Sequence, residues 1–429
     1  MRRVSSWVDA RAVPLVVTGL LAVAGAAYWF YWLVAARHGW QSYSDLWNSA
    51  GLALDIGHGH FASVYTPSSY LDSPPGLEFL LAPAMLVVHG AGLGTTAAQS
   101  STKVSGLLLA AVTTALACTV LFALDAVARQ WEYSDGRRLA LAVVAGLGVV
   151  SAAVFWGHPE DCIALAFVLW AALAVERRGA AGLRHAGWLL GVAVAFQPLA
   201  LLAVAPIVAR ARWRDLWSVA WRLVVPSVLV LLPELLATPA RSLHAVVDQP
   251  FFPPKESATP FSHLARSLGH GMYSGGTLRL VATLVAVVVG WVVCRRRHDL
   301  PFVLFVMAIA FTLRVVFESE LLGFYFFPVI AVCLLLSLRS GWARFNVCAA
   351  VSLLNLALGN RREHTIALWW PAMMATVLVL LVLAYTSLPA GNAGGADVRR
   401  LARRQRESSW VTISHVRLLD AQLPQRVAP

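Results

Sequence analysis

Two polar stretches in an otherwise apolar chain carry the side chains that could do chemistry. The first runs from Tyr43 to Pro75 and contains Asp45, followed by a Gly-His-Gly-His sequence at 57–60. The second is Gly157-His-Pro-Glu-Asp161, which joins two apolar segments with almost no loop. Ionisable groups this close to hydrocarbon are costly unless they line a wet cavity. The two stretches together indicate a site for a polar, hydroxyl-rich molecule, and an ordinary solvated loop is the alternative.

Asp45 and the nearby histidines also have structural interpretations. Asp45 precedes a predicted helix over Leu46–Leu54, and taken alone it is predicted to be the N-cap of that helix. His58 and His60 could bind a metal ion at close spacing, but the glycines around them favour a turn. No cluster in the chain has convincing metal-ligand spacing, so no metal site is predicted.

The acidic residues of the second stretch face a similar choice. Glu160 and Asp161 follow Pro159, a pattern that suits the first turn of a helix, where carboxylates meet the positive end of the helix dipole. Further along the chain, Arg314 lies four residues before Glu318 in an apolar segment. An ion pair along one helix explains that spacing, and a contact between Arg314 and a phosphate is the functional alternative.

Composition sets the class of protein in which these residues work. The chain has 429 residues, of which 59% are hydrophobic and 13% charged, and its mean hydropathy is +0.67. Long apolar runs separated by short basic loops indicate an all-α polytopic membrane protein with about 10–12 transmembrane helices. The net charge of +12 is explained by arginines in loops facing anionic lipid, so no nucleic acid partner is predicted. The five cysteines lie in apolar segments without a CxxC pair, which argues against disulfides or a zinc site.

Arginine positions predict how the chain threads the membrane. Residues 13–36 form the first crossing from a basic, cytoplasmic N-terminus with no cleavable signal, which makes 37–75 the first outer loop. The apolar run 77–88 is short and contains Pro83. If it lies at the interface or dips and returns, the arginines near 129–138 and near 177–184 are cytoplasmic, whereas a full crossing would put both groups outside.

The remaining crossings follow the same rule. The run 187–209 is broken at Gln197-Pro198 into halves of about 11 residues, too short to span the bilayer, so a broken pair that returns to the cytoplasm is predicted. A second large outer loop covers 238–276. In total we expect ten crossings and one broken pair within a membrane domain at 1–388. The basic tail at 389–429 is predicted to be cytoplasmic and partly disordered.

The order of several motifs resembles a known family. Tyr43-Ser-Asp45-Leu-Trp-Asn-Ser-Ala-Gly is followed by Val64-Tyr-Thr-Pro and by Ser73-Pro-Pro-Gly ahead of an apolar run. The polar turn at 157–161 and the Gly-rich segment ending at Gln197-Pro198 come next. Over roughly residues 13–215 this order resembles the polyprenyl-phosphomannose-dependent mannosyltransferases of actinobacteria, members of the GT-C glycosyltransferase superfamily.

The resemblance implies an inverting transfer from a lipid-phosphate-linked sugar to an acceptor on the outer face of the membrane. An acidic residue of the first outer loop acts as the base in that family, and Asp45 occupies its place. The break carries Gln197 where the family pattern has a lysine, and no Asp-x-Asp motif follows the first loop. The donor sugar stays open between mannose, which the resemblance favours, and arabinofuranose or another pentose or hexose.

The sequence therefore predicts a GT-C-like, polyprenyl-phosphate-sugar-dependent glycosyltransferase of the cell membrane with an extracytoplasmic site. Protein cations are expected to hold the leaving phosphate, so no cofactor is predicted. The expected partners are the lipid-linked donor, a glycolipid or glycan acceptor and membrane lipid. A non-catalytic lipid or polysaccharide transporter is the alternative, and it predicts charges buried along a path across the membrane. With Asp45 as catalytic base, the candidate substrate-binding residues are Tyr43, Trp47, His58, His158, Glu160, Asp161, Lys255, Arg266, Arg314, Glu318 and His364.

Overall fold

A computed structural model shows how the chain folds. It describes residues 11–35, 45–66, 71, 73–92, 103–251, 259–268, 273–319, 321–360 and 366–389. The chain divides into two units, Met1–Ser387 and Leu388–Pro429. Residues 390–429, most of the predicted basic tail, lie outside the described residues.

Helices dominate the part of the chain that is described, from the N-terminal region onward. Its first half contains α2 (Ala12–Ala35), α3 (Leu46–Gly57), η1 (Phe61–Ser63), α4 (Gly76–Gly90), α5 (Lys103–Ala117), α6 (Thr119–Gln130), α7 (Asp135–Val150), the π-helix η3 (Ser151–Trp156), α8 (Pro159–Arg178), α9 (Ala180–Phe196), η4 (Pro198–Ala200) and α10 (Leu201–Val208).

The second half continues the pattern, with one pair of two-residue strands. It contains α11 (Trp213–Ala237), α12 (Pro239–Asp248), β1 (Pro250–Phe251), α13 (Ser262–Leu268), β2 (Tyr273–Ser274), α14 (Gly276–Arg296), α15 (Leu300–Phe317), η5 (Gly323–Phe326), α16 (Phe327–Ser337), η6 (Leu338–Ser340), α17 (Trp342–Gly359) and α18 (Ile366–Tyr385). β1 and β2 pair antiparallel within the second predicted outer loop.

Eight helical segments among the described residues are long and apolar enough to cross a membrane. This confirms the predicted all-α, multi-pass membrane protein. Two further predicted crossings correspond to α2 and α8, helices of 24 and 20 residues that are not in this set of eight. The eight segments are Leu107–Gln130, Asp135–Trp156, Trp213–Ala237, Gly276–Arg296, Leu300–Phe317, Gly323–Ser340, Trp342–Gly359 and Leu368–Tyr385.

Basic turns from distant parts of the sequence meet at one end of the helix bundle, which we call the arginine end. Arg177, in the last turn of α8, donates from Nε to Gln130 Oε1 at the end of α6, at 3.0 Å and across 47 residues of sequence. Arg339, after α16, lies with Cζ 5.4 Å from the ring centroid of Trp131. The turns α6–α7, α8–α9 and α16–α17 are therefore on one side, as the arginine argument predicts.

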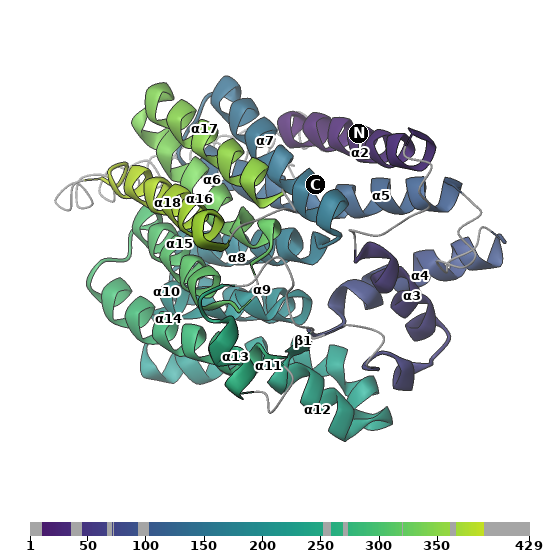
Figure 1. Cartoon of the computed structure of the whole chain (residues 1–429). Coiled ribbons are helices and arrows are strands. Elements are labelled where there is room, and N and C mark those ends of the chain that lie inside the picture. The colour runs from purple at the N-terminus through teal and green to yellow at the C-terminus, as the bar shows by residue number, and fades with distance from the viewer. Residues whose placement is uncertain are drawn as a thin grey trace, which may run out of the picture. The chain divides into compact units, whose positions relative to one another are not determined.

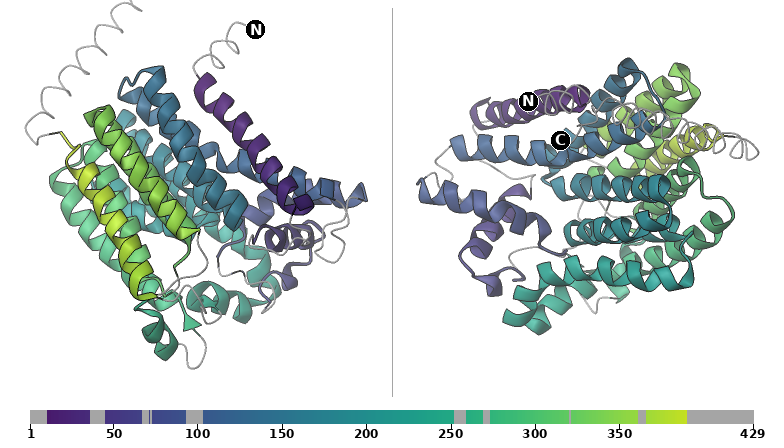
Figure 2. Two further views of the ribbon diagram at one scale, coloured as in Figure 1. Left: turned by 45° about the horizontal axis from the view of Figure 1, so that its top comes forward. Right: turned by 180° about the vertical axis from the view of Figure 1, so that it is seen from behind.

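The α3–α4 hairpin packs beside the bundle rather than through it. α4 has 15 residues with Pro83 inside, a length of about 22 Å, against a hydrocarbon core of about 30 Å. Buried Leu46 of α3 and Leu77 of α4 join a cluster with Leu109 of α5 and Ile163 of α8. Figures 1 and 2 show α2 alongside α5, with α3 and α4 together at one edge of the bundle. This packing sets Asp45, at the start of α3, near the start of α8.

The predicted break at Gln197-Pro198 is present, but its first arm is longer than expected. α9 begins at Ala180 and has 17 residues, whereas a half of about 11 residues beginning at 187 was predicted. Gln197 is extended, with φ −153° and ψ 117°, and the chain then turns into η4 and α10. α9 packs against α8 and α11, and α10 packs against α14 and α15. The break is thus enclosed by protein, the setting in which membranes tolerate non-helical backbone.

Candidate active site

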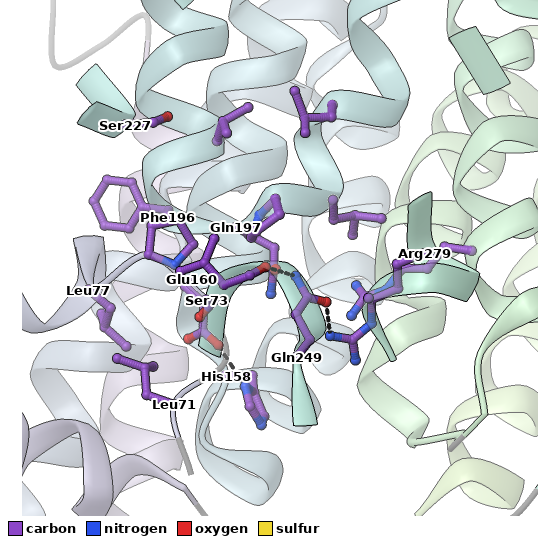
Figure 3. A pocket seen from close by; sticks show the side chains of 18 of the residues that line it. Leu71, Ser73, Leu77, His158, Glu160, Phe196, Gln197, Ser227, Gln249 and Arg279 are labelled. Carbon is purple, nitrogen blue, oxygen red and sulfur yellow. Dashed lines mark hydrogen bonds and ion pairs between the residues drawn. The ribbon is translucent and has the colours of Figure 1, made fainter. Parts of the chain in front are cut away.

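A cavity of about 520 Å³ opens at the end of the bundle opposite the arginine end. Its walls come from α3, α4, the α8 start, the α9–α10 break, α11, α12, α14, α15 and η5. In Figure 3, Leu77, Glu160, Phe196 and Arg279 mark the walls from α4, α8, α9 and α14. Carboxylates and a histidine line one side, and Gln249, Arg279 and Arg314 line another. Leucines of α10, α11 and α14 extend it into the apolar part of the bundle, among them Leu202, Leu231 and Leu280.

The two predicted polar stretches meet in this cavity through one histidine. His158 Nε2 lies 2.9 Å from Asp45 Oδ2, and its Nδ1 lies 2.6 Å from Glu160 Oε1. The Asp45 side chain is 61% exposed at the cavity mouth, whereas that of Glu160 is 11% exposed. The imidazole therefore connects an accessible carboxylate to a buried one, across 113 residues of sequence between Asp45 and His158.

Local backbone geometry aims His158 at Asp45. α7 ends in the π-helix η3, and Gly157 then adopts a left-handed conformation with φ 79°, which favours glycine. Pro159 starts α8, where the missing N–H of proline is not needed. The His158 ring stacks on Phe324 of η5 with centroids 4.0 Å apart and an interplanar angle of 14°. The ring is held on one face by this contact and at both nitrogens by carboxylates.

Asp45 precedes α3 as predicted, but its side chain makes no capping hydrogen bond to that helix. Its backbone N–H instead donates to the Trp156 carbonyl at 3.1 Å, and its carboxylate contacts His158. Aspartate at this position usually accepts from the free N–H groups of the first turn. The structure therefore favours a role for the Asp45 carboxylate in the cavity over the helix-capping alternative.

Charge around His158 decides its protonation. Burial alone lowers the pKa of the imidazole, but the Glu160 carboxylate and the hydrogen bond to Asp45 outweigh it and hold the pKa well above its usual value. His158 is thus expected to be a cation at neutral pH. A charged imidazolium between two carboxylates orients them and cannot itself accept a proton.

Two arginines on the opposite side share one buried carboxylate. Glu318, 1% exposed, accepts at Oε1 from Arg279 Nε at 2.8 Å and from Arg314 Nε at 2.9 Å. Arg279 Nη1 also donates to Gln249 Oε1 at 2.6 Å, which ties α14 to the segment after α12. Arg314 Cζ lies 4.3 Å from the centroid of the Tyr325 ring. The predicted Arg314–Glu318 ion pair therefore exists, and it also aligns two guanidinium groups along the cavity wall.

Several buried polar atoms at this end of the bundle lack a close hydrogen-bond partner among the described residues. Glu160 Oε2 and Arg314 Nη1 belong to residues that line the cavity, whereas the two carboxylate oxygens of Asp161 belong to a residue that does not line it and lies near Gln197. Asp161 is 1% exposed, and its Oδ1 lies 4.0 Å from Arg314 Nη1, too far for a direct hydrogen bond. Buried polar groups are normally paired, so this arrangement suits a polar ligand or water that would complete it.

Glu78 in the first turn of α4 is a cavity residue that the sequence did not single out. It is 2% exposed and lines the cavity with Glu160. Burial raises the pKa of Glu78 to about 7, and the nearby Glu160 carboxylate adds to the rise. Its position directly after Ser73-Pro-Pro-Gly76 is the signal that could have identified it, because an acidic residue opening a short apolar helix is costly without a function.

Other predicted site residues lie elsewhere or cannot be placed. The His58 ring lies tilted against His60 and edge-on to His89, at centroid distances of 5.8 and 5.6 Å, and His58 is not among the cavity-lining residues. Arg266 on α13 is exposed and is not among the lining residues. The residues outside the described ranges are Tyr43, Lys255 and His364, and the side chain of Trp47 is not described either.

Arg279 and Gln249 are further contributors that sequence reasoning missed. Arg279 is an arginine in the first turn of an apolar crossing, directly after the second outer loop, and that isolated charge is the available signal. Gln249 sits in a left-handed conformation with φ 44° and carries no sequence pattern that would mark it. No group of three or more His, Cys, Asp or Glu residues in the described ranges is placed to hold a metal ion.

The fold and the cavity define the class of the protein. It is an all-α, multi-pass membrane protein with a cavity at one end of the bundle, carboxylates and a histidine on one wall and paired arginines on another. No protein-family model matches the chain, and no curated protein matches it.

Proposed function

We propose that this protein is a membrane glycosyltransferase that moves a sugar, with mannose favoured, from a polyprenyl-phosphate donor to a glycolipid or glycan acceptor. One observation carries the proposal. The exposed carboxylate of Asp45 contacts His158, whose other ring nitrogen contacts Glu160, and it lines the same cavity as two arginines that share Glu318.

Each wall has a role in this reaction. An acceptor hydroxyl entering at the cavity mouth gives its proton to the Asp45 carboxylate as its oxygen attacks the anomeric carbon. The bond from that carbon to the phosphate oxygen breaks, and the polyprenyl phosphate leaves with the electron pair. Arg279 and Arg314 stabilise the charge on the departing phosphate, which guanidinium groups bind well. Attack opposite to the leaving group inverts the anomeric centre.

The shape of the cavity suits a substrate with a polar head and an apolar tail. Its lining combines charged and polar side chains with leucines of α10, α11 and α14. A sugar phosphate would occupy the polar part, and a prenyl chain would follow the leucines. A transporter of lipids or polysaccharides is the second candidate, and it requires charges along a path across the membrane. The charges that line the cavity belong to one end of the bundle, where they run from the exposed Asp45 to the buried Glu160 and Arg314, and this supports transfer chemistry.

Turnover of a labelled donor tests the proposal. The purified protein in lipid nanodiscs is given polyprenyl-phosphate mannose, labelled in the sugar, with a lipid extract of the source membrane as acceptor. We expect labelled glycolipid and free polyprenyl phosphate in equal amounts, and a parallel reaction with an arabinofuranosyl donor decides the sugar. A donor that stays intact while labelled lipid crosses the bilayer would support the transporter instead.

The orientation in the membrane is part of the proposal and has its own test. With the arginine end in the cytoplasm, the cavity opens outside and both termini lie inside. The five native cysteines are buried, so introduced cysteines dominate labelling. In intact cells a membrane-impermeant maleimide is expected to label T66C and K255C and to spare D135C and A181C. Labelling of D135C from outside would reverse the assignment and make α4 a crossing.

A further inference from the structure

The π-helix at the end of α7 is clamped by a single side chain from a distant part of the chain. Asn360, at the C-terminus of α17, accepts two hydrogen bonds at its Oδ1. Ser151 Oγ donates at 3.1 Å and Trp156 Nε1 at 2.9 Å. Ser151 and Trp156 are the first and last residues of η3, so one amide oxygen holds both of its ends.

The backbones of His158 and Asp45 are both hydrogen-bonded to carbonyl groups of this π-helix. The His158 N–H donates to the Ala152 carbonyl at 2.8 Å, and the Asp45 N–H donates to the Trp156 carbonyl at 3.1 Å. π-helices are rare and occur mostly as single turns at functional sites. If η3 relaxed to an α-helix, the residues beyond it would turn by about 100°, and the Trp156 carbonyl would no longer meet Asp45.

A close contact between two glycines brings Asn360 and the His158 stacking partner to the same place. A Cβ added at Gly323 would lie 2.8 Å from the Gly359 backbone, and a Cβ at Gly359 would lie 2.8 Å from Gly323 Cα. Gly359 precedes Asn360, and Gly323 precedes Phe324, whose ring covers His158. The α17 terminus and η5 are therefore fitted together at backbone distance next to the site.

We propose that Asn360 is a positioning residue, which fixes the Asp45–His158 contact by clamping the two ends of the π-helix. Its effect on geometry is independent of the reaction, whereas its effect on catalysis rests on the proposed glycosyl transfer. Asn360 is not among the residues that line the cavity, so its effect has to pass through Ser151 and Trp156.

The first test reads the geometry without any activity. His158 is modified by diethyl pyrocarbonate only when its imidazole is neutral, and the modified peptide is quantified by mass spectrometry across pH 5–9. The charged groups around the ring are Asp45 at the start of α3, Glu160 and Asp161 on α8, and Glu78 on α4. In N360A the Asp45 contact loosens, so the midpoint of modification is expected to fall by about 1 pH unit.

Three variants separate the clamp from general damage. N360D keeps the acceptor oxygen that both bonds use and adds a negative charge, so its midpoint should not fall below the wild-type value. N355A removes another buried asparagine of α17, whose Nδ2 donates to Thr376 Oγ1 at 2.7 Å, and it should also leave the midpoint unchanged. W156F removes the indole donor and keeps an aromatic ring, and it should shift the midpoint in the same direction as N360A. W156F keeps the test available should N360A not fold.

The second test asks for the catalytic consequence. In N360A we expect kcat for sugar transfer to fall roughly 10- to 100-fold, because a misplacement of about 1 Å costs that much. The KM for the lipid donor should stay near the wild-type value, since Arg279 and Arg314 are untouched. An unchanged midpoint in folded N360A and W156F would overturn the positioning role. If the midpoint shifts in these variants but the wild-type protein transfers no sugar, the proposed function is overturned and the clamp stands.

Discussion

The two ends of the bundle each bury a carboxylate near arginines, but they differ in how closely the guanidinium groups approach its oxygens. At the arginine end, Asp125 is 3% exposed, with Oδ1 2.6 Å from Arg138 Nε and Oδ2 3.0 Å from Arg129 Nε. At the cavity end, Asp161 is 1% exposed, and the cation that it faces, Arg314 Nη1, is 4.0 Å away. Asp125 thus has two arginines within 3.0 Å, whereas the Arg314 guanidinium stays 4.0 Å from Asp161.

Under the proposed function, this difference distinguishes a structural ion-pair cluster from charged residues that serve the reaction. Removing one partner of a buried ion pair strongly lowers the free energy of unfolding of the protein, because the other charge is left buried without compensation. Unpaired charges beside a cavity cost stability in the resting protein and are retained where they meet a ligand. The same substitution at the two ends should therefore affect different quantities, stability at one and transfer at the other.

Asp45→Asn is expected to give the largest effect. It keeps the shape of the side chain and removes the proton acceptor, so transfer should fall by roughly 10²–10⁴-fold. Expression and the thermal unfolding midpoint should stay near wild type, because the Asp45 carboxylate does not cap α3. The measurement is sugar transfer in membranes, normalised to protein level, with Asp55→Asn as the matched control. An active Asp45→Asn protein would end the assignment of Asp45 as base.

Asp125→Asn makes the same change at the arginine end and should act on stability. Removing the charge leaves Arg129 and Arg138 without their buried partner, and we expect the free energy of unfolding to fall by about 3 kcal/mol. Transfer per folded molecule should remain near wild type. Thermal unfolding, followed by size-exclusion chromatography, measures the loss of stability. Loss of transfer in a folded Asp125→Asn protein would break the division between the two ends.

Arg314 tests whether the cavity arginines bind phosphate or only stabilise the helix. We expect Arg314→Ala to lower kcat/KM for the lipid-phosphate donor by roughly 10²-fold, with a smaller loss in Arg314→Lys, which keeps the charge without the planar fork. Arg129→Ala, at the other end, is the matched control and should leave donor use unchanged. Equal and mild effects from both Arg314 substitutions would reduce this residue to an ion-pair partner of Glu318.

Glu78→Gln should give the smallest effect, and one that depends on pH. The raised pKa of Glu78, about 7, means that the folded protein binds a proton that the unfolded chain releases above about 4.5. The stability contributed by Glu78 is fully present below pH 4.5 and is lost as pH rises from 4.5 through about 7. Glu78→Gln should thus be more stable than wild type by about 1–3 kcal/mol at pH 8, with little difference at pH 5.

The control for Glu78 is Glu132→Gln, an exposed carboxylate at the arginine end. Thermal unfolding at pH 5 and pH 8 measures both variants. Because the Glu132 side chain is exposed, Glu132→Gln reports the effect of the same substitution without burial, and the gain of Glu78→Gln at pH 8 should exceed it. If Glu78→Gln shows no greater gain in stability at pH 8 than Glu132→Gln, the raised pKa attributed to burial of Glu78 is contradicted.

Local pattern sufficed for much of the fold. Helix α15 was predicted at 300–317 and is found at Leu300–Phe317, because its apolar run is bounded by charges on both sides. The break at Gln197-Pro198 followed from the missing backbone donor of proline. Boundaries were weaker where apolar and small residues continue past a charge, as at α9, which begins at Ala180 although Arg184 lies within it.

Only those parts of the candidate site that have a local sequence pattern could be predicted. Asp45 and 157–161 stood out as charge in an apolar chain, and the fold joins them through His158. The partners supplied by long-range packing, Arg279, Glu78 and Asn360, had no local pattern strong enough to select them. His58 and Arg266 were selected for their chemistry and their side of the membrane, and neither property says which helix a residue will face.

The extended residue at the α9–α10 break also has a consequence for how the protein is made. The second arm of the break, α10, is covered by α14 and α15, which come later in the chain. About a hundred residues separate Gln197 from the end of α14, so at about 5–20 residues per second a nascent chain takes roughly 5–20 s to supply that cover. Until then α10, an apolar helix of eight residues that is too short to span the bilayer, lacks two of the helices that pack against it. Biogenesis of this fold is therefore a problem of timing, in which the N-terminal half has to be sheltered until the C-terminal half arrives.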